Sequence, residues 1–134
     1  MLRFLLDTDI CSFLINCRFP EVRQQALRLP RASMGISAVT RAELRYGALL
    51  KGTGELRRLI EGFLEEFECR SWDSECADIH AEIHVHLKRT GAPAGANDTL
   101  IAAHALALDV TLVTHNTRHF EKVPGLRLAD WVNP

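Results

Sequence analysis

The sequence carries almost no net charge. Its 16 Lys and Arg residues are balanced by 17 Asp and Glu residues, which leaves a formal charge of −1 at pH 7. Affinity for nucleic acid comes largely from Lys and Arg contacts to phosphate, so no global basic field recruits nucleic acid here. A nucleic-acid role would have to depend on a local patch. The first half of the chain is the richer in arginine, with Arg23, Arg28, Arg31, Arg41 and Arg45.

Paired cysteines and long apolar runs are also missing. The four cysteines, Cys11, Cys17, Cys69 and Cys76, form no C-x-x-C pair, which argues against a zinc knuckle. No apolar stretch approaches the roughly 18 residues that a membrane-spanning helix needs. No secretory signal is visible at the start of the chain. We therefore expect a cytoplasmic protein that has no membrane partner and keeps its thiols reduced.

Repeats, linkers and low-complexity tracts are absent as well, and 134 residues fit a single domain, 1–134. Short apolar runs with strand character alternate with helical patterns, which predicts an α/β fold with a mostly parallel sheet. The expected strands cover 2–6, 33–36, 67–71, 110–113 and 126–129. The expected helices cover 10–16, 20–29, 38–50, 56–67, 74–90 and 98–108, with Thr8 or Asp9, Ser37, Asp73 and Asn97 as N-caps.

Three carboxylates stand where an apolar run ends or where a charge is unexpected. Asp7 follows strand 2–6, Glu43 lies on the apolar stripe of helix 38–50, and Asp98 opens helix 98–108. Ligands of parallel sheets bind outside the carboxyl ends of the strands, so this fold can gather such residues at one edge. Two carboxylates ~4 Å apart repel by about 4 kcal/mol at an effective dielectric near 20. A cluster of them therefore indicates a divalent metal ion, and a metal site indicates hydrolysis.

Each of the three acids also has a purely structural interpretation. Asp7 can cap the helix that follows it. Glu43 can pair with Arg41 or Arg45, since a buried acid is costly without a partner. Asp98 in a first helical turn is favoured by the helix dipole.

The histidines give a weaker indication of chemistry. His80 and His84 are four residues apart, but Glu82 is misplaced for an H-E-x-x-H zinc motif and no third ligand is nearby. We expect them to be solvated or packed. His104 is expected to be a buried polar group, and His115 lies nearer to the carboxylates, where it can contact a substrate.

Four segments in order resemble a known family. They are Leu5–Asp9, Ile36–Leu44, Gly95–Ala105 and Leu112–Asn116. Together with the ending from Phe120 through Trp131, they are similar to the PIN-domain ribonucleases, and above all to the VapC toxins of bacterial type II toxin–antitoxin pairs. The resemblance covers nearly the whole chain. It implies a three-layer PIN-like α/β fold in which a short sheet is flanked by helices.

The resemblance also implies an activity and a site. It implies a Mg²⁺-dependent endoribonuclease, with Mn²⁺ as an alternative, in which Asp7, Glu43 and Asp98 are the catalytic acids. Asp7 and Asp98 would ligate the metal directly, and Glu43 would ligate it or position the attacking water. Residues that would support them are Thr114 and Asn116, where Asn116 stands at the family's fourth acidic position. Further candidates near the site are Asp9, Glu121 and His115.

Partners are implied in the same way. VapC toxins are held inactive by a cognate VapB-like antitoxin that binds DNA and inserts a segment near the acidic pocket, and they usually form homodimers within a larger assembly. Among them, this chain most resembles those that cut tRNA. Proteins read RNA sequence mainly in single-stranded loops, so an unpaired loop is the expected target.

Two other functions fit parts of the sequence. Asn116 at the acidic position is compatible with a PIN-like module that binds RNA or protein but is catalytically weak. The D-x-D of Asp7 and Asp9 after a strand also occurs in haloacid-dehalogenase-like phosphatases. That family, however, has Thr or Val where this chain has Cys11, and its later Lys and acidic pair are not found here.

Overall fold

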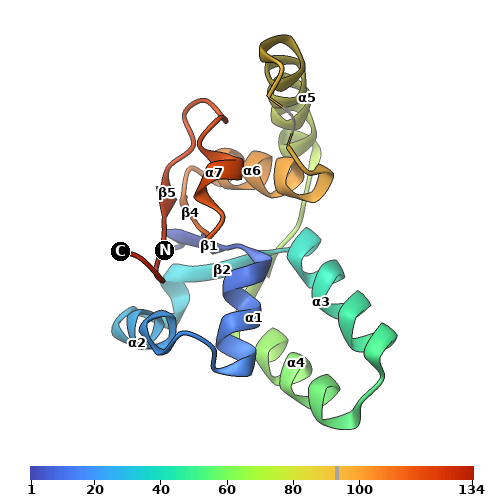
Figure 1. Cartoon of the computed structure of the whole chain (residues 1–134), viewed down its shortest axis with the longest axis vertical. Coiled ribbons are helices and arrows are strands. Elements are labelled where there is room, and N and C mark those ends of the chain that lie inside the picture. Colours follow the sequence, from blue (N-terminus) through green and yellow to red (C-terminus); the bar gives the residue numbers. More distant parts are fainter. Residues whose placement is uncertain (93) are drawn as a thin grey trace.

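The computed structural model describes residues 1–92 and 94–134, whose strands form one five-stranded sheet (Figure 1). The strand order is β3-β2-β1-β4-β5, and every neighbouring pair is parallel. The strands are β1 (Phe4–Leu6), β2 (Met34–Ser37), β3 (Glu68–Arg70), β4 (Thr111–Val113) and β5 (Leu128–Ala129). The predicted α/β class and parallel sheet are confirmed.

The strand order reverses at β1, which is the centre of the sheet. From β1 the chain moves outward through β2 and β3 on one side, and later through β4 and β5 on the other. Such a reversal leaves a crevice at the carboxyl ends of the two strands where ligands of open α/β sheets bind. Leu6, the last residue of β1, pairs with Val113, the last residue of β4. Asp7 and Thr114 therefore emerge side by side at this crevice.

Helices connect the strands at close to the expected bounds. They are α1 (Thr8–Asn16), α2 (Pro20–Arg28), α3 (Ala38–Lys51), α4 (Gly54–Glu66), α5 (Ser74–Thr90), α6 (Ala96–Leu108) and α7 (Thr117–Phe120), with a 3-10 turn at Arg31–Ser33. The sequence indicated only a turn where α7 forms. None of the helices that the structure describes is long and apolar enough to cross a membrane.

Two of the expected N-caps are wrong. Asp7 itself caps α1, since its side chain accepts a hydrogen bond from the Thr8 N–H, so neither Thr8 nor Asp9 is the cap. Gly95, and not Asn97, is the N-cap of α6, which places Asp98 in the first turn of that helix. In both cases the helix begins two residues earlier than predicted, because Asp7 caps α1 directly after β1 and Gly95 caps α6.

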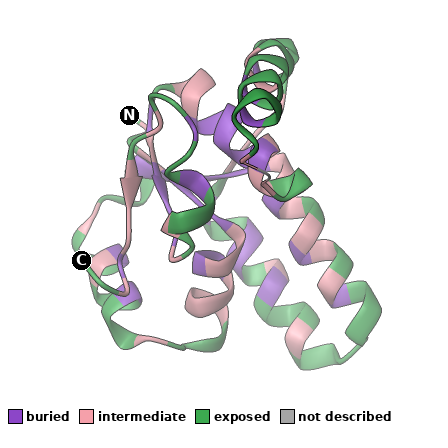
Figure 2. Ribbon diagram, turned by 45° about the horizontal axis from the view of Figure 1, so that its top comes forward, coloured by how far each residue is buried: buried purple, intermediate pink, exposed green. Residues whose placement is uncertain are grey.

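Two apolar cores lie on opposite faces of the sheet. Side chains alternate across a strand, so Leu6 of β1 points to one face and Leu5 to the other. Helices α1 to α4 cover the face that contains Leu6, and α5 to α7 cover the face that contains Leu5. Figure 2 colours the buried stretches purple, and they lie on the strands and on parts of the helices that pack against them. Each fully buried Leu or Ile contributes about 1.5–3 kcal/mol, which fixes the three layers.

Helices α3 and α4 form a hairpin that extends away from the sheet (Figure 1). An ion pair between Arg45 and Glu61 joins the two helices. The far half of α3 keeps apolar side chains in solvent: Tyr46, Leu49 and Leu50 are 67%, 68% and 68% exposed. This hairpin carries Glu43 on its first helix, near the sheet.

Candidate active site

The predicted acids come from three helices that meet at the carboxyl edge of the sheet. Asp7 caps α1, Glu43 lies on α3 and Asp98 lies in the first turn of α6. The Asp7 backbone N–H donates to the Val113 carbonyl at 2.9 Å, so Asp7 continues the pairing of β1 with β4 by one residue. The sheet itself therefore sets the position of this carboxylate.

Asp7 is buried and both of its carboxylate oxygens accept hydrogen bonds. Oδ1 accepts from the Thr8 N–H at 2.8 Å and Oδ2 accepts from the Thr114 hydroxyl at 2.8 Å. Burial, followed by the nearby charges of Asp9 and Asp98, raises the pKa of Asp7 to about 7, although the two hydrogen bonds oppose that rise. The ionised form of Asp7 is therefore disfavoured by burial and by neighbouring carboxylates, and a cation bound here would offset that cost.

Thr8 connects Glu43 to Asp7. Its hydroxyl donates to Glu43 Oε1 at 2.7 Å, and its backbone N–H is the one that Asp7 binds. The Thr8 hydroxyl also lies 3.1 Å from the Thr40 hydroxyl on α3. Arg45 was one of the two expected structural partners of Glu43. It forms its ion pair with Glu61 instead.

Asp98 lies at the opposite side of the crevice, on α6. Its side chain is 26% exposed, and Oδ2 lies 3.2 Å from His119 Nδ1 on α7. The charge of Asp98 contributes to the raised pKa of Asp7, which indicates that the two carboxylates share one electrostatic environment. The first turn of a helix also presents free N–H groups that favour an anionic side chain here.

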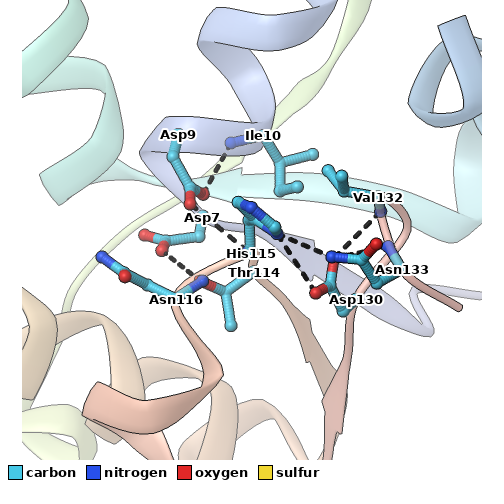
Figure 3. Close-up of polar contacts among 9 residues, drawn as sticks. All are labelled: Asp7, Asp9, Ile10, Thr114, His115, Asn116, Asp130, Val132 and Asn133. Carbon is cyan, nitrogen blue, oxygen red and sulfur yellow. Dashed lines mark hydrogen bonds and ion pairs between the residues drawn. The ribbon is translucent and has the colours of Figure 1, made fainter. Parts of the chain in front are cut away.

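A second group of polar residues borders Asp7 (Figure 3). Asp9 Oδ1 accepts from the Ile10 N–H at 2.7 Å, and Oδ2 accepts from the His115 N–H at 3.3 Å. Burial raises the pKa of Asp9. His115 Nδ1 lies 3.1 Å from Asp130 Oδ2. This row runs from α1 to the segment that follows β5, with His115 at its centre.

Of the other predicted residues Thr114, Asn116 and Glu121, all within the described part of the chain, only Thr114 forms a hydrogen bond with Asp7. Thr114 is buried and binds Asp7, as a supporting residue should. Asn116 donates its backbone N–H to the Thr114 hydroxyl at 3.0 Å, while its side chain is exposed and bonds to none of the residues described. Glu121 is exposed at the end of α7, and in residues 1–92 and 94–134 its carboxylate forms no ion pair. A fourth acid is therefore better sought in Asp9.

The donor set suits a hard cation bound partly through water. No three His, Cys, Asp or Glu side chains within residues 1–92 and 94–134 lie close enough to enclose a metal ion directly. Mg²⁺ does not require that, because it keeps several waters and is commonly held by one or two carboxylates. Asp7 would supply a buried oxygen ligand whose ionisation is opposed first by burial and then by neighbouring negative charge. The residues therefore fit Mg²⁺ or Mn²⁺ and do not fit a four-ligand zinc site.

A groove of about 770 Å³ adjoins Glu43 between α3 and α6. Val39, Tyr46, Trp72 and Leu100 supply most of its apolar wall. The Trp72 indole N–H donates to the Leu100 carbonyl at 2.9 Å, which fixes one side of the groove. An extended or helical apolar segment that entered this groove would approach Glu43.

Sequence reasoning missed three contributors to this region. Thr8 was considered only as a cap, although its position directly after Asp7 could have suggested a second role. Asp130 directly follows β5, just as Asp7 follows β1, and that shared position was the available signal. Thr40 gave no signal, because its closeness to Thr8 depends on how α3 packs against α1.

Comparisons with known proteins agree with this architecture. The family described as PIN domain matches residues 4–126. The chain is 41% identical to the tRNA(fMet)-specific endonuclease VapC of Shigella flexneri, over 98% of this chain and 99% of that protein. It is 34% identical to ribonuclease VapC2 of Rickettsia felis, over 96% and 97% of the two chains.

Solved structures give the same result. The DNA-bound VapBC structure from Salmonella typhimurium contains a chain that superposes with a TM-score of 0.88 at 36% identity, covering 98% of this chain and 99% of that one. The promoter-DNA-bound VapBC2 structure from Rickettsia felis gives a TM-score of 0.87 at 30% identity, over 97% and 99%. Both similarities extend over the sheet, the hairpin and the acid-bearing helices.

Proposed function

Because this chain belongs to the PIN-domain family, we propose that it is an endoribonuclease toxin of a toxin–antitoxin pair that cleaves tRNA with Mg²⁺, or alternatively Mn²⁺. The observation that carries the proposal is Asp7. It is buried at the reversal point of the sheet, and Asp9 and Asp98 help to raise its pKa to about 7. Similarity to VapC nucleases over almost the whole chain supports the RNA substrate.

Each side chain at the site has its own role in the proposed hydrolysis of the phosphodiester bond. When bound, Mg²⁺ neutralises charge on the phosphate and lowers the pKa of water. Asp7 and Asp98 would hold the ion from the two sides of the crevice. Thr114 keeps the Asp7 carboxylate in one orientation through its hydroxyl. Glu43, held by Thr8, is placed to orient the attacking water and accept its proton.

Asn116 fits a role in substrate binding. Its side chain is exposed beside the crevice and has no competing hydrogen bond among the residues described. An amide in that position can donate to a phosphate oxygen without adding negative charge. Asn116 therefore takes the place of an acid without disabling the three that remain.

The partner proposed for this chain is an antitoxin of the VapB kind. The similar solved structures are VapBC complexes. The groove beside Glu43 and the exposed Tyr46, Leu49 and Leu50 offer an apolar surface on one helix. An antitoxin segment bound there would cover Glu43 and close access to the site. We further propose that the toxin is a homodimer in this assembly, and a tRNA substrate would place the activity in the cytoplasm.

Incubation with total tRNA tests the proposal. With Mg²⁺ we expect cleavage at a single-stranded loop and products with a 5′ phosphate, and with EDTA we expect none. Asp98→Asn should abolish cleavage and growth arrest, while the matched exposed variant Asp78→Asn on α5 should behave as the parent. Products that end in a 2′,3′-cyclic phosphate would contradict hydrolysis by water.

The same incubation distinguishes the proposed nuclease from a PIN-like module that only binds RNA. A module without catalytic activity would bind tRNA and leave it intact with Mg²⁺ present, and Asp7→Ala would then change nothing but stability. The phosphatase alternative is replaced by membership of the PIN-domain family, which matches residues 4–126.

A further inference from the structure

A cluster of flat side chains adjoins the acidic crevice. We propose that His115, Phe13, Phe19 and Arg18 form a stacking site for an unpaired base beside the phosphate that is cut. The inference rests on the proposed RNA substrate and adds to it the group that holds the nucleotide in place. None of these residues takes part in the hydrolysis described above.

The cluster is built around two phenylalanines at the junction of α1 and α2. Phe13 and Phe19 meet edge to face, with ring centroids 4.8 Å apart. The Arg18 guanidinium lies over both rings, 5.8 Å from the Phe13 centroid and 5.1 Å from the Phe19 centroid. Each ring is half-buried against the core, and Arg18 is exposed. The result is an anchored platform with a cationic plane on its outer side.

His115 lies between this platform and the part of the crevice that contains Asp7 and Asp9. Its ring centroid is 6.2 Å from Phe13 and 5.9 Å from Phe19, at interplanar angles of 68° and 48°. Neither phenylalanine therefore stacks face to face on the imidazole, and 37% of the His115 side chain is exposed. Its backbone N–H binds Asp9, and the residue before it, Thr114, binds Asp7. A base on this ring would be close to a phosphate held at Asp7.

Asp130 fixes the orientation of the imidazole. Its Oδ2 lies 3.1 Å from His115 Nδ1. Its Oδ1 accepts hydrogen bonds from the backbone N–H groups of Val132, at 2.9 Å, and Asn133, at 3.2 Å. Because the carboxylate is tied to two backbone groups, it cannot follow the ring if the ring rotates. Figure 3 shows His115 between the Asp7 and Asp9 carboxylates and Asp130. Asp130 is thus a positioning residue.

The charge around the cluster favours a base over a phosphate. Asp9 and Asp130 lie on two sides of His115, and their negative charge opposes an anion at the ring itself. Every base has a π face, so aromatic and guanidinium planes hold single-stranded RNA with little dependence on sequence. The site would thus select an unstacked loop nucleotide and leave recognition of its identity to other contacts.

The test measures stacking without cleavage. The probe is the anticodon stem–loop of initiator tRNA with 2-aminopurine at one loop position at a time, because stacking quenches the fluorescence of this base. All proteins carry Asp98→Asn and are kept in EDTA, so no bond is cut. We expect one loop position to be quenched by the parent protein.

The variants then identify the surface responsible. His115→Ala should weaken binding of that probe by about 5- to 100-fold, which corresponds to the loss of one base–aromatic stack. His115→Phe should retain most of the quenching, because the flat ring remains. Arg18→Ala and Arg18→Lys should both reduce it, since only the guanidinium has a plane. The control His86→Ala, an exposed histidine on α5, should match the parent.

Three results would overturn the inference: no quenched position in the parent, His115→Phe as weak as His115→Ala, or an equal loss in His86→Ala. Failure of the proposed nuclease function shows separately, as tRNA left intact by the wild-type chain with Mg²⁺. In that case the quenching experiment still decides whether His115 stacks on a base.

Discussion

Asp7 controls how the metal-free protein responds to pH. Its pKa rises from 3.8 to about 7 on folding, chiefly because burial disfavours the charge. A raised carboxyl pKa contributes stability that is fully present below the unfolded value and is lost as pH rises through the folded value. Between about pH 4 and pH 8, ionisation of this one group therefore costs the folded state up to about 4 kcal/mol.

Asp7→Asn removes that cost and keeps the shape of the side chain. In EDTA at about pH 8 we expect the variant to be more stable than the wild type by roughly 2–4 kcal/mol, and we expect the difference to vanish near pH 4. Urea unfolding at both pH values measures it. A variant less stable than the wild type at pH 8 would show that the hydrogen bonds of Asp7 outweigh its charge.

Thr8 is expected to matter for catalysis and not for RNA binding. Thr8→Val keeps the shape and removes the hydroxyl that holds Glu43 Oε1 at 2.7 Å. If Glu43 is the proposed base, loss of this one positioning contact should lower kcat by about 10- to 100-fold with little change in KM. Single-turnover cleavage of tRNA with Mg²⁺ separates the two parameters. A rise in KM alone would place Thr8 in substrate binding.

For single residues, the sequence identified the acids better than it identified the side chains that hydrogen-bond around them. Asp7, Glu43 and Asp98 could be selected because each interrupts an apolar pattern, and a resemblance to a family ordered them. The contact between Thr8 and Glu43 spans 35 residues of sequence and depends on the packing of α1 against α3, which no local pattern encodes. Asp130 directly follows a strand, as Asp7 does, but its contact with His115 depends on β4 and β5 lying side by side, which the sequence does not give.

At the scale of elements, one hydrogen bond joins the two layers that carry Glu43 and Asp98. Ser37 caps α3 by accepting from the Val39 N–H at 3.1 Å, and its hydroxyl lies 2.8 Å from His104 Nδ1 on α6. His104 is completely buried, and burial lowers its pKa, so it is neutral. Its Nε2 has no partner among the residues described, so Ser37 is its one polar contact there.

Ser37→Ala should therefore lower the free energy of unfolding by more than the loss of an N-cap alone would. Removing an N-cap hydroxyl costs about 1 kcal/mol, and leaving buried His104 unsatisfied adds about 1–3 kcal/mol. The matched control is Thr53→Ala, which removes the cap of α4 and, among the residues that the structure describes, no second hydrogen bond. Urea unfolding of both variants gives the difference. Equal losses would mean that the bond to His104 contributes nothing to stability.

The helices were predicted more accurately than their starting points. Helix α5 was placed correctly at 74–90 with Asp73 as its cap, since an N-cap aspartate and a C-terminal glycine delimit it. Helices α1 and α6 begin earlier than expected, because Asp7 caps α1 immediately after β1 and Gly95 starts α6 without a side-chain cap. Local signals thus identified the elements, while the junction with the sheet determined their first residues.

For the whole molecule, binding of the proposed metal ion and protonation of Asp7 would compete. A ligand that binds only the folded state stabilises it, and a Mg²⁺ ion bound at Asp7 would displace the proton that Asp7 holds below about pH 7. We expect Mg²⁺ to raise Tm clearly at about pH 8 and hardly at about pH 5.5. Asp98→Asn should weaken the shift at pH 8, and Asp78→Asn should not. A shift independent of pH would place the ion away from Asp7.

The parallel sheet and its layers were predictable as a class, but the crevice was not. Alternating strand and helix patterns indicate a parallel sheet without giving the order of its strands. The observed order β3-β2-β1-β4-β5 puts the ends of β1 and β4 next to each other, and with them Asp7 and Thr114. That order depends on contacts between segments more than 100 residues apart, such as the bond of Thr114 to Asp7.

The central position of β1 has a consequence for the order of events during synthesis. β1 is made well before its neighbour β4 and before Asp130, the residue that orients His115. A growing chain that lacks them has Asp7 without Thr114 and cannot complete the crevice. A chain with the proposed nuclease activity therefore could not cut RNA until the segment that reaches Thr114 and Asp130 had been made and folded against β1.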